Sequence, residues 1–162
     1  MRVIDASGAI YGRLSAYVAK RLLEGEEITI INASKAVITG NRSFVIGKFK
    51  ERLDIGSVRK GPYYPKTPEN ILRRSIGDML PKKITKGKEA LSRCRVYRNV
   101  PSDIEKDKIE KIEGVVTDKV SGIITLEDLS KELLKWIISS QLEKERQPLL
   151  ELSQKRERVL SL

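Results

Sequence analysis

Histidine is absent from this sequence of 162 residues, and cysteine occurs once. Without histidine, a Ser-His-Asp triad, a Cys-His pair, a histidine general base and an ordinary mixed Cys/His zinc site are excluded. A lone Cys94 cannot form an internal disulfide, so we expect a small packed thiol in a protein of a reducing compartment. The chain is therefore not a disulfide-stabilised secreted domain.

Long apolar runs and aromatic residues are also scarce. No run approaches the roughly 18 apolar residues that a membrane span requires, and residues 1–5 lack the apolar stretch of a signal peptide. Aromatic residues make up 5% of the chain, so the core must be small. The length fits a single domain, residues 1–162, with a core over about residues 1–100 and a C-terminal extension over about residues 101–162. These features predict a soluble, cytoplasmic protein.

Positive charge, in contrast, is abundant and unevenly placed. The chain has 32 Lys and Arg against 22 Asp and Glu, a formal net charge of +10. Residues 59–98 hold 12 basic and 3 acidic residues, whereas residues 1–58 hold 9 and 6, and residues 99–162 hold 11 and 13. Uncompensated positive charge repels itself and destabilises a compact chain unless a polyanion is present. Residues 59–98, called the basic segment below, therefore favour nucleic-acid binding over a merely solvated face.

Apolar periodicity predicts an α/β arrangement in the amino-terminal half. Residues 3–6 and 28–31 read as strands, and residues 36–39 continue extended. Residues 13–24 have apolar residues at helical spacing and are followed by Gly25, while residues 42–53 form a weaker helix candidate. A strand, a helix and a strand in this order predict parallel pairing through a right-handed crossover.

The pattern changes after residue 55. Residues 56–66 interleave glycine, proline, basic and aromatic residues with almost nothing to bury, which predicts a mobile loop until a partner orders it. Thr67 and Pro68 begin a predicted helix that ends at Pro81. Its expected inward stripe comprises Ile71, Leu72, Ser75, Ile76, Met79 and Leu80, and its expected outward, basic side comprises Arg73, Arg74 and Gly77.

Three further elements are expected towards the C-terminus. Residues 85–94 suit a short helix, and residues 95–98 alternate like a strand with one basic face. Residues 101–122 mix both signs of charge and remain ambiguous. Thr125 is predicted to cap a last helix, with Asp128 at the position of a capping-box partner and Pro148 ending or kinking the helix.

The turn of residues 7–13 lies where a phosphate-binding loop would follow a strand. It matches neither the dinucleotide nor the P-loop glycine pattern, so we expect Gly12 and Arg13 to form a tight turn that meets an RNA phosphate. Asp5, at the preceding strand end, is expected to accept hydrogen bonds from loop amides or from Arg13. We predict no catalytic residue, no metal site and no cofactor.

Several short stretches together resemble a known family, the universal large-subunit ribosomal protein thirteen family in its archaeal and eukaryotic form. They run through residues 3–98 in family order, and Gly77-Asp78-Met79-Leu80-Pro81 is the most specific of them. Residues 126–136 resemble the carboxy-terminal helix of that form, whereas residues 99–124 match poorly. The other matching pieces are Asp5-Ala6-Ser7-Gly8, Gly12-Arg13-Leu14, Ile31-Asn32-Ala33, Thr39-Gly40-Asn41, Gly61-Pro62, Arg73 to Gly77, Lys86-Gly87, Leu91 and Val96-Tyr97.

The resemblance implies a three-layer α/β/α fold with a four-stranded parallel sheet, here with a C-terminal helical extension. It also implies a structural constituent of the large ribosomal subunit that binds large-subunit rRNA, contacts neighbouring ribosomal proteins and supports subunit assembly. No enzymatic activity, membrane or small-molecule substrate is expected.

The basic segment supplies most of the predicted RNA-binding residues. Tyr63 and Tyr64 are expected to stack on bases or ribose, although the pair could instead pin the proline turn to the domain. The first choices for phosphate contacts are Arg73, Arg74, Lys82, Lys83, Lys86 and Lys88. The remaining predicted residues are Arg13, Lys35, Arg42, Lys48, Arg59, Lys60, Lys66, Gly77, Arg95 and Arg98.

Two other functions remain open from the residues alone. A small nucleotide enzyme would use Asp5 and Arg13, although histidine and a phosphate-loop motif are absent. An architectural DNA-binding protein would use the same positive charge.

Overall fold

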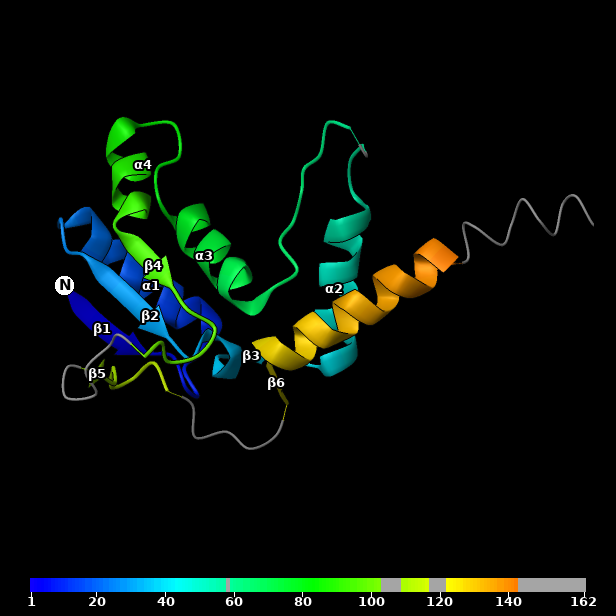
Figure 1. Ribbon diagram of the computed structural model, residues 1–162, viewed down its shortest axis with the longest axis horizontal. Coiled ribbons are helices and arrows are strands. Elements are labelled where there is room, and N and C mark those ends of the chain that lie inside the picture. The colour runs from blue at the N-terminus through cyan, green and yellow to red at the C-terminus, as the bar shows by residue number, and fades with distance from the viewer. Residues whose placement is uncertain (58, 103–108, 117–121, 143–162) are drawn as a thin grey trace, which may run out of the picture.

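The computed structural model describes residues 1–57, 59–102, 109–116 and 122–142 (Figure 1). Its main sheet has four strands in the order β4-β2-β1-β5. These strands are β1 (Arg2–Asp5), β2 (Ile28–Ile31), β4 (Cys94–Val96) and β5 (Ile109–Glu110), and every pairing between neighbours is parallel. All residues of β2 are buried, as the apolar, β-branched run predicts for a central strand.

Three helices pack against one another beside this sheet: α1 (Tyr11–Leu23), α3 (Pro68–Met79) and α4 (Thr85–Ser92). Helix α1 connects β1 to its parallel neighbour β2 and buries Leu14, Val18 and Leu22. Gly25, with a φ of +102°, follows the end of α1 in a conformation that favours glycine. Cys94 is fully buried in β4, and this burial raises its pKa to about 11, which confirms the packed thiol.

A second, two-stranded sheet joins distant parts of the chain. The short 3-10 helix η1 (Ala33–Lys35) leads into β3 (Val37–Thr39), which pairs antiparallel with β6 (Ile123–Thr125). The chain is then helical over residues 126–142, called the C-terminal helix below. The backbone N–H of Asp128 donates to the Thr125 hydroxyl at 3.1 Å, and this hydroxyl donates to the Asp128 carboxylate at 2.8 Å. The predicted cap is confirmed, while Pro148 lies outside the described residues.

Helix α2 (Arg42–Asp54) lies beside the C-terminal helix, on the side of the molecule away from the N-terminus (Figure 1). Val45 is buried and belongs to the same apolar cluster as Leu129 and Leu133 of the C-terminal helix. Arg42 and Glu132 form an ion pair at 3.5 Å between the two helices. The end of the described chain therefore contributes to the core as well as covering it.

The predicted fold class is confirmed, because a four-stranded parallel sheet, alternating α and β elements and a C-terminal helical extension are all present. The division into a core before residue 100 and an extension after it stays a prediction. In the described part of the chain, no helix is long and apolar enough to cross a membrane.

Some local predictions were wrong. Helix α1 begins at Tyr11, so Gly12 lies in its first turn, and the tight turn falls instead at Ser7 and Gly8, where the φ of Gly8 is +71°. Gly77 does not face outward, because it is buried and a Cβ added there would lie 3.3 Å from the Leu91 side chain of α4. Met79 is 45% exposed rather than inward. Packing of α4 onto α3 had no signal in the periodicity of α3 alone.

Candidate nucleic-acid interface

An open groove lies between the loop before α3, α3 itself and the start of the chain that leads to α4. Its volume is about 450 Å³. Arg73 and Arg74 come from α3, and Lys82 comes from the connection between α3 and α4. The other lining residues are Pro65, Asn70, Gly77, Asp78 and Leu91.

Most cations of the basic segment have no carboxylate to neutralise them. Lys82 pairs with Asp78, and Arg98 pairs with Glu127 at 3.4 Å. Within the described residues no other cation of this segment has a carboxylate within 4.0 Å; these are Arg59, Lys60, Lys66, Arg73, Arg74, Lys83, Lys86, Lys88, Arg93 and Arg95. All of them are exposed except Arg74 and Arg93, which are half-buried. The positive charge that the sequence concentrates here therefore faces solvent.

Backbone packing positions the cations at the start of α4. Gly87 lies against Pro81, the first residue of the turn before α4, and a Cβ added to it would overlap the Pro81 carbonyl oxygen. Lys86 and Lys88 flank this glycine and are both exposed. The close approach requires glycine here and holds the two lysines on a turn anchored by the proline that ends α3.

Arg74 has a structural task in addition to its charge. Its guanidinium lies 4.3 Å from the centroid of the Tyr64 ring and donates a hydrogen bond to the Tyr63 carbonyl oxygen at 3.2 Å. These contacts attach the loop of residues 56–66 to α3. Tyr64 is half-buried by them, whereas the Tyr63 side chain is 67% exposed. The two tyrosines, equivalent in the sequence, therefore occupy different environments.

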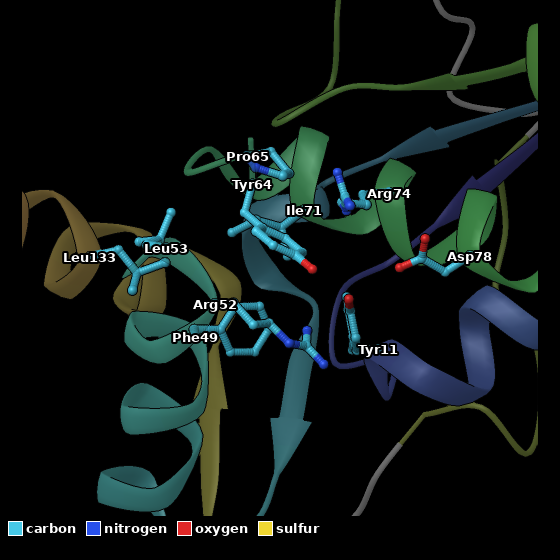
Figure 2. Close-up of a pocket in the computed structure, with 10 residues that line it drawn as sticks. All are labelled: Tyr11, Phe49, Arg52, Leu53, Tyr64, Pro65, Ile71, Arg74, Asp78 and Leu133. Carbon is cyan, nitrogen blue, oxygen red and sulfur yellow. The ribbon is translucent and has the colours of Figure 1, made fainter. Parts of the chain in front are cut away.

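A partly open cavity of about 120 Å³ adjoins the groove on the side of α2 (Figure 2). Tyr64 and Arg74 line it from the loop and α3, and Phe49 and Arg52 line it from α2. Arg52 lies 5.2 Å from the centroid of the Phe49 ring. The remaining lining residues are Tyr11, Leu53, Pro65, Ile71, Asp78 and Leu133.

Sequence reasoning missed Tyr11, Phe49 and Arg52 as candidate binding residues. Arg52 follows Phe49 by one helical turn, a spacing that places the two side chains on the same face of α2. That signal is weak without knowledge of what faces it. Burial raises the pKa of the Tyr11 phenol above its usual value, in spite of a hydrogen bond with Ser75, so the phenol stays protonated in this cavity.

The predicted residues outside the groove are dispersed. Arg13 lies on α1, Lys35 on η1, and Arg42 and Lys48 on α2, all of them exposed. Among these, Arg42 is paired with Glu132. The loop residues Arg59, Lys60 and Lys66 are exposed beyond α2, and Arg95 is exposed on β4. The RNA-binding role of each residue stays a prediction.

Asp5 has the structural environment that we expected of it. Its carboxylate accepts hydrogen bonds from the Ser7 backbone N–H at 3.0 Å, the Ser7 hydroxyl at 2.7 Å and the Asn32 side chain at 2.9 Å. Burial by itself would raise its pKa, but these hydrogen bonds and the charge of Lys111 hold the pKa below its usual range. Of the two expected partners, the structure confirms the loop amide; no hydrogen bond or ion pair among the described residues joins Asp5 to Arg13.

Comparison with known proteins identifies the family of this chain. A large ribosomal subunit protein uL13 of Thermoplasma acidophilum is 90% identical over 133 residues, which cover 82% of this chain and 98% of that protein. The protein of the same name from Archaeoglobus fulgidus is 48% identical over 134 residues, covering 81% of this chain and 86% of that protein. The family model of ribosomal protein L13 matches residues 1–103. The chain therefore belongs to the ribosomal protein L13 family, as its motifs predicted.

Proposed function

We propose that this protein is a structural constituent of the large ribosomal subunit and binds rRNA through its basic segment. The observation that carries the proposal is the exposed positive charge around α3 and α4: Arg73 lines the groove, and Lys83, Lys86 and Lys88 are exposed without a carboxylate partner among the described residues. Family membership supports the same function, since the relatives are named large ribosomal subunit proteins. The protein would act as a part of the cytoplasmic ribosome and not as an enzyme.

The proposed mechanism is electrostatic placement. Arginine and lysine side chains neutralise phosphates and release condensed counterions, so the affinity falls as the salt concentration rises. Side chains cannot read the deep, narrow major groove of an RNA helix, so the groove and loop would fit the shape of folded RNA. The C-terminal third has nearly balanced charge, 11 basic against 13 acidic residues, which suits contacts with neighbouring ribosomal proteins.

A salt titration tests the proposal. Binding of the purified protein to a large-subunit rRNA fragment should depend steeply on log salt, and Arg73→Ala should lower that slope by about 0.7–0.9 for each phosphate that is no longer neutralised. Arg73 is preferred to Arg74, because Arg74 also attaches the loop. Lys20→Ala removes an exposed cation from α1, outside the groove, and is the matched control, which should leave the slope unchanged.

Two outcomes would contradict the proposal. Equal affinity for duplex DNA of the same length, at one fixed salt concentration, would favour an architectural DNA-binding protein. Absence of the protein from the large-subunit fraction of a sucrose gradient would show that it is not a constituent of the ribosome.

A further inference from the structure

We propose that the partly open cavity beside the groove binds one unstacked nucleotide of the RNA, with a single-ring base inserted between Tyr64 and the Phe49-Arg52 pair. This inference rests on the proposed RNA-binding function and names what the RNA contributes at this place. Five features of the cavity support it.

The walls of the cavity are flat groups of the kind on which unpaired bases stack. Arg74 lies over the Tyr64 ring on one side, and Arg52 lies over the Phe49 ring on the other. Figure 2 shows these four side chains coming from two separate parts of the chain toward the same space. Aromatic rings and guanidinium planes are the usual partners of bases that leave the stack of an RNA strand.

The size of the cavity suits one small ring. Its volume is about 120 Å³. An apolar cavity of about 150 Å³ in another protein admits benzene, so a pyrimidine-sized ring is the right scale and a second base is not. Leu53, Ile71 and Leu133 contribute apolar side chains to the lining, which would contact a ring without competing for its polar edge.

Two arginines at the rim retain N–H groups without an acceptor among the described residues, although another nitrogen of Arg74 donates to the Tyr63 carbonyl oxygen. Arg52 is half-buried and makes no hydrogen bond or ion pair with any described residue other than its ring contact. The Nε atom of Arg74 is buried and also lacks a hydrogen-bond partner among the described residues. A buried donor such as Arg74 Nε is costly when it is unsatisfied, so an acceptor such as a base carbonyl or a phosphate oxygen would stabilise the site.

The opposite part of the rim offers both an acceptor and a hydroxyl. Asp78 lines the cavity and pairs with Lys82, and the Tyr11 phenol, which also has a hydrogen bond with Ser75, lies between Arg52 and Asp78 (Figure 2). A base presents donors and acceptors along one edge, which this mixture of groups can match.

The cavity is also continuous with the proposed path of the RNA backbone. Pro65, Arg74 and Asp78 line both the cavity and the open groove. A strand whose phosphates contact Arg73 and Lys82 in the groove can therefore turn a single base across Arg74 into the cavity.

The experiment compares variants of the full chain in binding to the same rRNA fragment across a range of salt concentrations. Tyr64→Leu removes the ring but no charge, so it should weaken binding about 5-fold to 100-fold, the range measured for one stacked base, with no change in the slope against log salt. Tyr64→Phe keeps the ring and should bind within about 2-fold of the wild type on the same grounds. Phe44→Leu, at an exposed phenylalanine of α2 that does not line the cavity, is the matched control.

Ultraviolet cross-linking provides a readout that a folding defect cannot imitate. Irradiation of the wild-type complex should attach one pyrimidine nucleotide to a peptide that contains Tyr64 or Phe49, and Arg52→Gln should reduce the yield. Thermal unfolding of each free variant shows whether it has lost structure. If Tyr64→Leu is destabilised, the binding of Arg52→Gln tests the nucleotide site instead, because Arg52 has no hydrogen-bond acceptor among the described residues.

The outcomes separate this inference from the proposed function. If Tyr64→Leu and Arg52→Gln bind like the wild type and cross-links occur only elsewhere, the nucleotide site is wrong, although the Arg73→Ala effect can still stand. If the wild-type protein binds no rRNA fragment, the proposed function fails first.

Discussion

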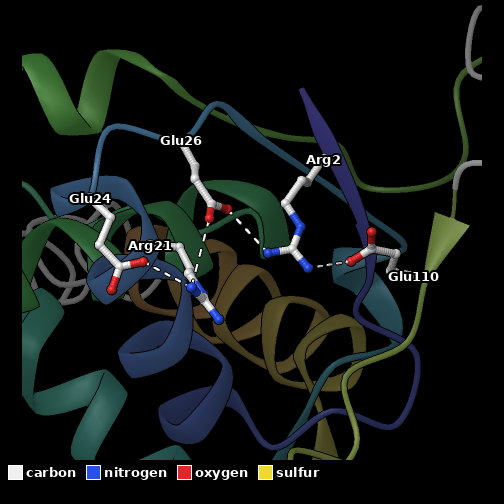
Figure 3. A network of polar contacts seen from close by, with 5 residues as sticks. All are labelled: Arg2, Arg21, Glu24, Glu26 and Glu110. Carbon is white, nitrogen blue, oxygen red and sulfur yellow. Dashed lines mark hydrogen bonds and ion pairs between the residues drawn. The ribbon is translucent and has the colours of Figure 1, made fainter.

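At the end of the main sheet nearest the N-terminus, two arginines lie close to three carboxylates. Few cations of the basic segment, in contrast, have a carboxylate nearby. Arg2 contacts Glu110 at 2.7 Å and Glu26 at 3.2 Å, and Arg21 contacts Glu24 at 2.9 Å and Glu26 at 3.8 Å (Figure 3). In the basic segment, only Lys82 and Arg98 have such partners within the described residues.

The difference separates charge that holds the chain together from charge that is available to a partner. The paired network joins β1, β5 and the end of α1, and its hydrogen bonds to Glu110 and Glu26 raise the pKa of Arg2 above its usual value. Lys86 and Lys88, in contrast, have no described carboxylate partner and flank Gly87, whose backbone packs against Pro81. The following predictions test this contrast, from the largest expected effect to the smallest.

The first prediction concerns the packing that supports the unpaired lysines. Gly87→Ala places a methyl group against the Pro81 carbonyl and should destabilise the protein by about 3 kcal/mol, the upper part of the usual range for overpacking. Chemical denaturation measures the change. Gly47→Ala is the control: it lies on α2 with no atom within 4 Å of the added Cβ, so better helix propensity should stabilise it by about 0.5–1 kcal/mol. Equal effects of the two changes would contradict the proposed support.

The second prediction is that a polyanion stabilises the whole protein. At an rRNA-fragment concentration of 100 times the dissociation constant, linkage should raise the free energy of unfolding by about 2.7 kcal/mol. The gain should shrink as added salt weakens binding. Thermal unfolding with and without the fragment provides the measurement. If the fragment does not change the unfolding midpoint at low salt, the unpaired charge does not have the proposed role.

The third prediction is that neutralising two exposed lysines of α4 separates stability from binding. Lys86→Gln with Lys88→Gln should leave the free protein as stable as before or slightly more stable, because these exposed cations have no described carboxylate partner. The slope of rRNA affinity against log salt should fall by up to about 0.7–0.9 for each phosphate that the two lysines neutralise in the wild type. A clear loss of stability without RNA would show that the lysines serve the fold.

The fourth prediction uses the pH dependence of Asp5, a carboxylate held mainly by neutral donors. Since its folded-state pKa lies below the unfolded value, its contribution is present above the usual carboxyl range and is lost as the pH falls below about 4. Asp5→Asn should therefore lower stability at neutral pH and reduce the loss between neutral and acidic pH. Urea denaturation at several pH values measures this, and parallel curves for both proteins would argue against it.

The smallest effect is expected in the paired network of Arg2 and Arg21. Arg21→Gln removes contacts to Glu24 and Glu26 and should lower the unfolding midpoint slightly, with the difference vanishing at high salt because the pairs are exposed. Its affinity for rRNA should equal that of the wild type. An effect on binding as large as that of Arg73→Ala would mean that the two regions do not differ in the proposed way.

Much of the fold was predictable because the signals are local. The apolar run of residues 28–31 predicted a buried strand, and Thr125 with Asp128 predicted a helix start that the structure confirms. Gly77 misled the prediction, since its side of α3 looked basic and smooth while α4 covers it. A helix folding back onto its neighbour leaves no mark in the periodicity of that neighbour.

The candidate site, too, was predictable only in part. Its charge was visible in the count of cations, but Tyr63 and Tyr64 could not be told apart until Arg74 was placed beside one of them. The cavity needs Phe49 and Arg52 from α2 to face Tyr64 across about a dozen residues of intervening chain, and no local pattern specifies that approach.

By itself, the order of residues determined the elements, the excess of positive charge in one segment and the exclusion of histidine chemistry, because each depends on residue type or on neighbours along the chain. Only the tertiary structure decided which cations are neutralised, which glycine is covered and which aromatic rings share a cavity. Those outcomes depend on distances between residues far apart in the chain, such as Arg2 and Glu110, and packing of the whole core sets these distances.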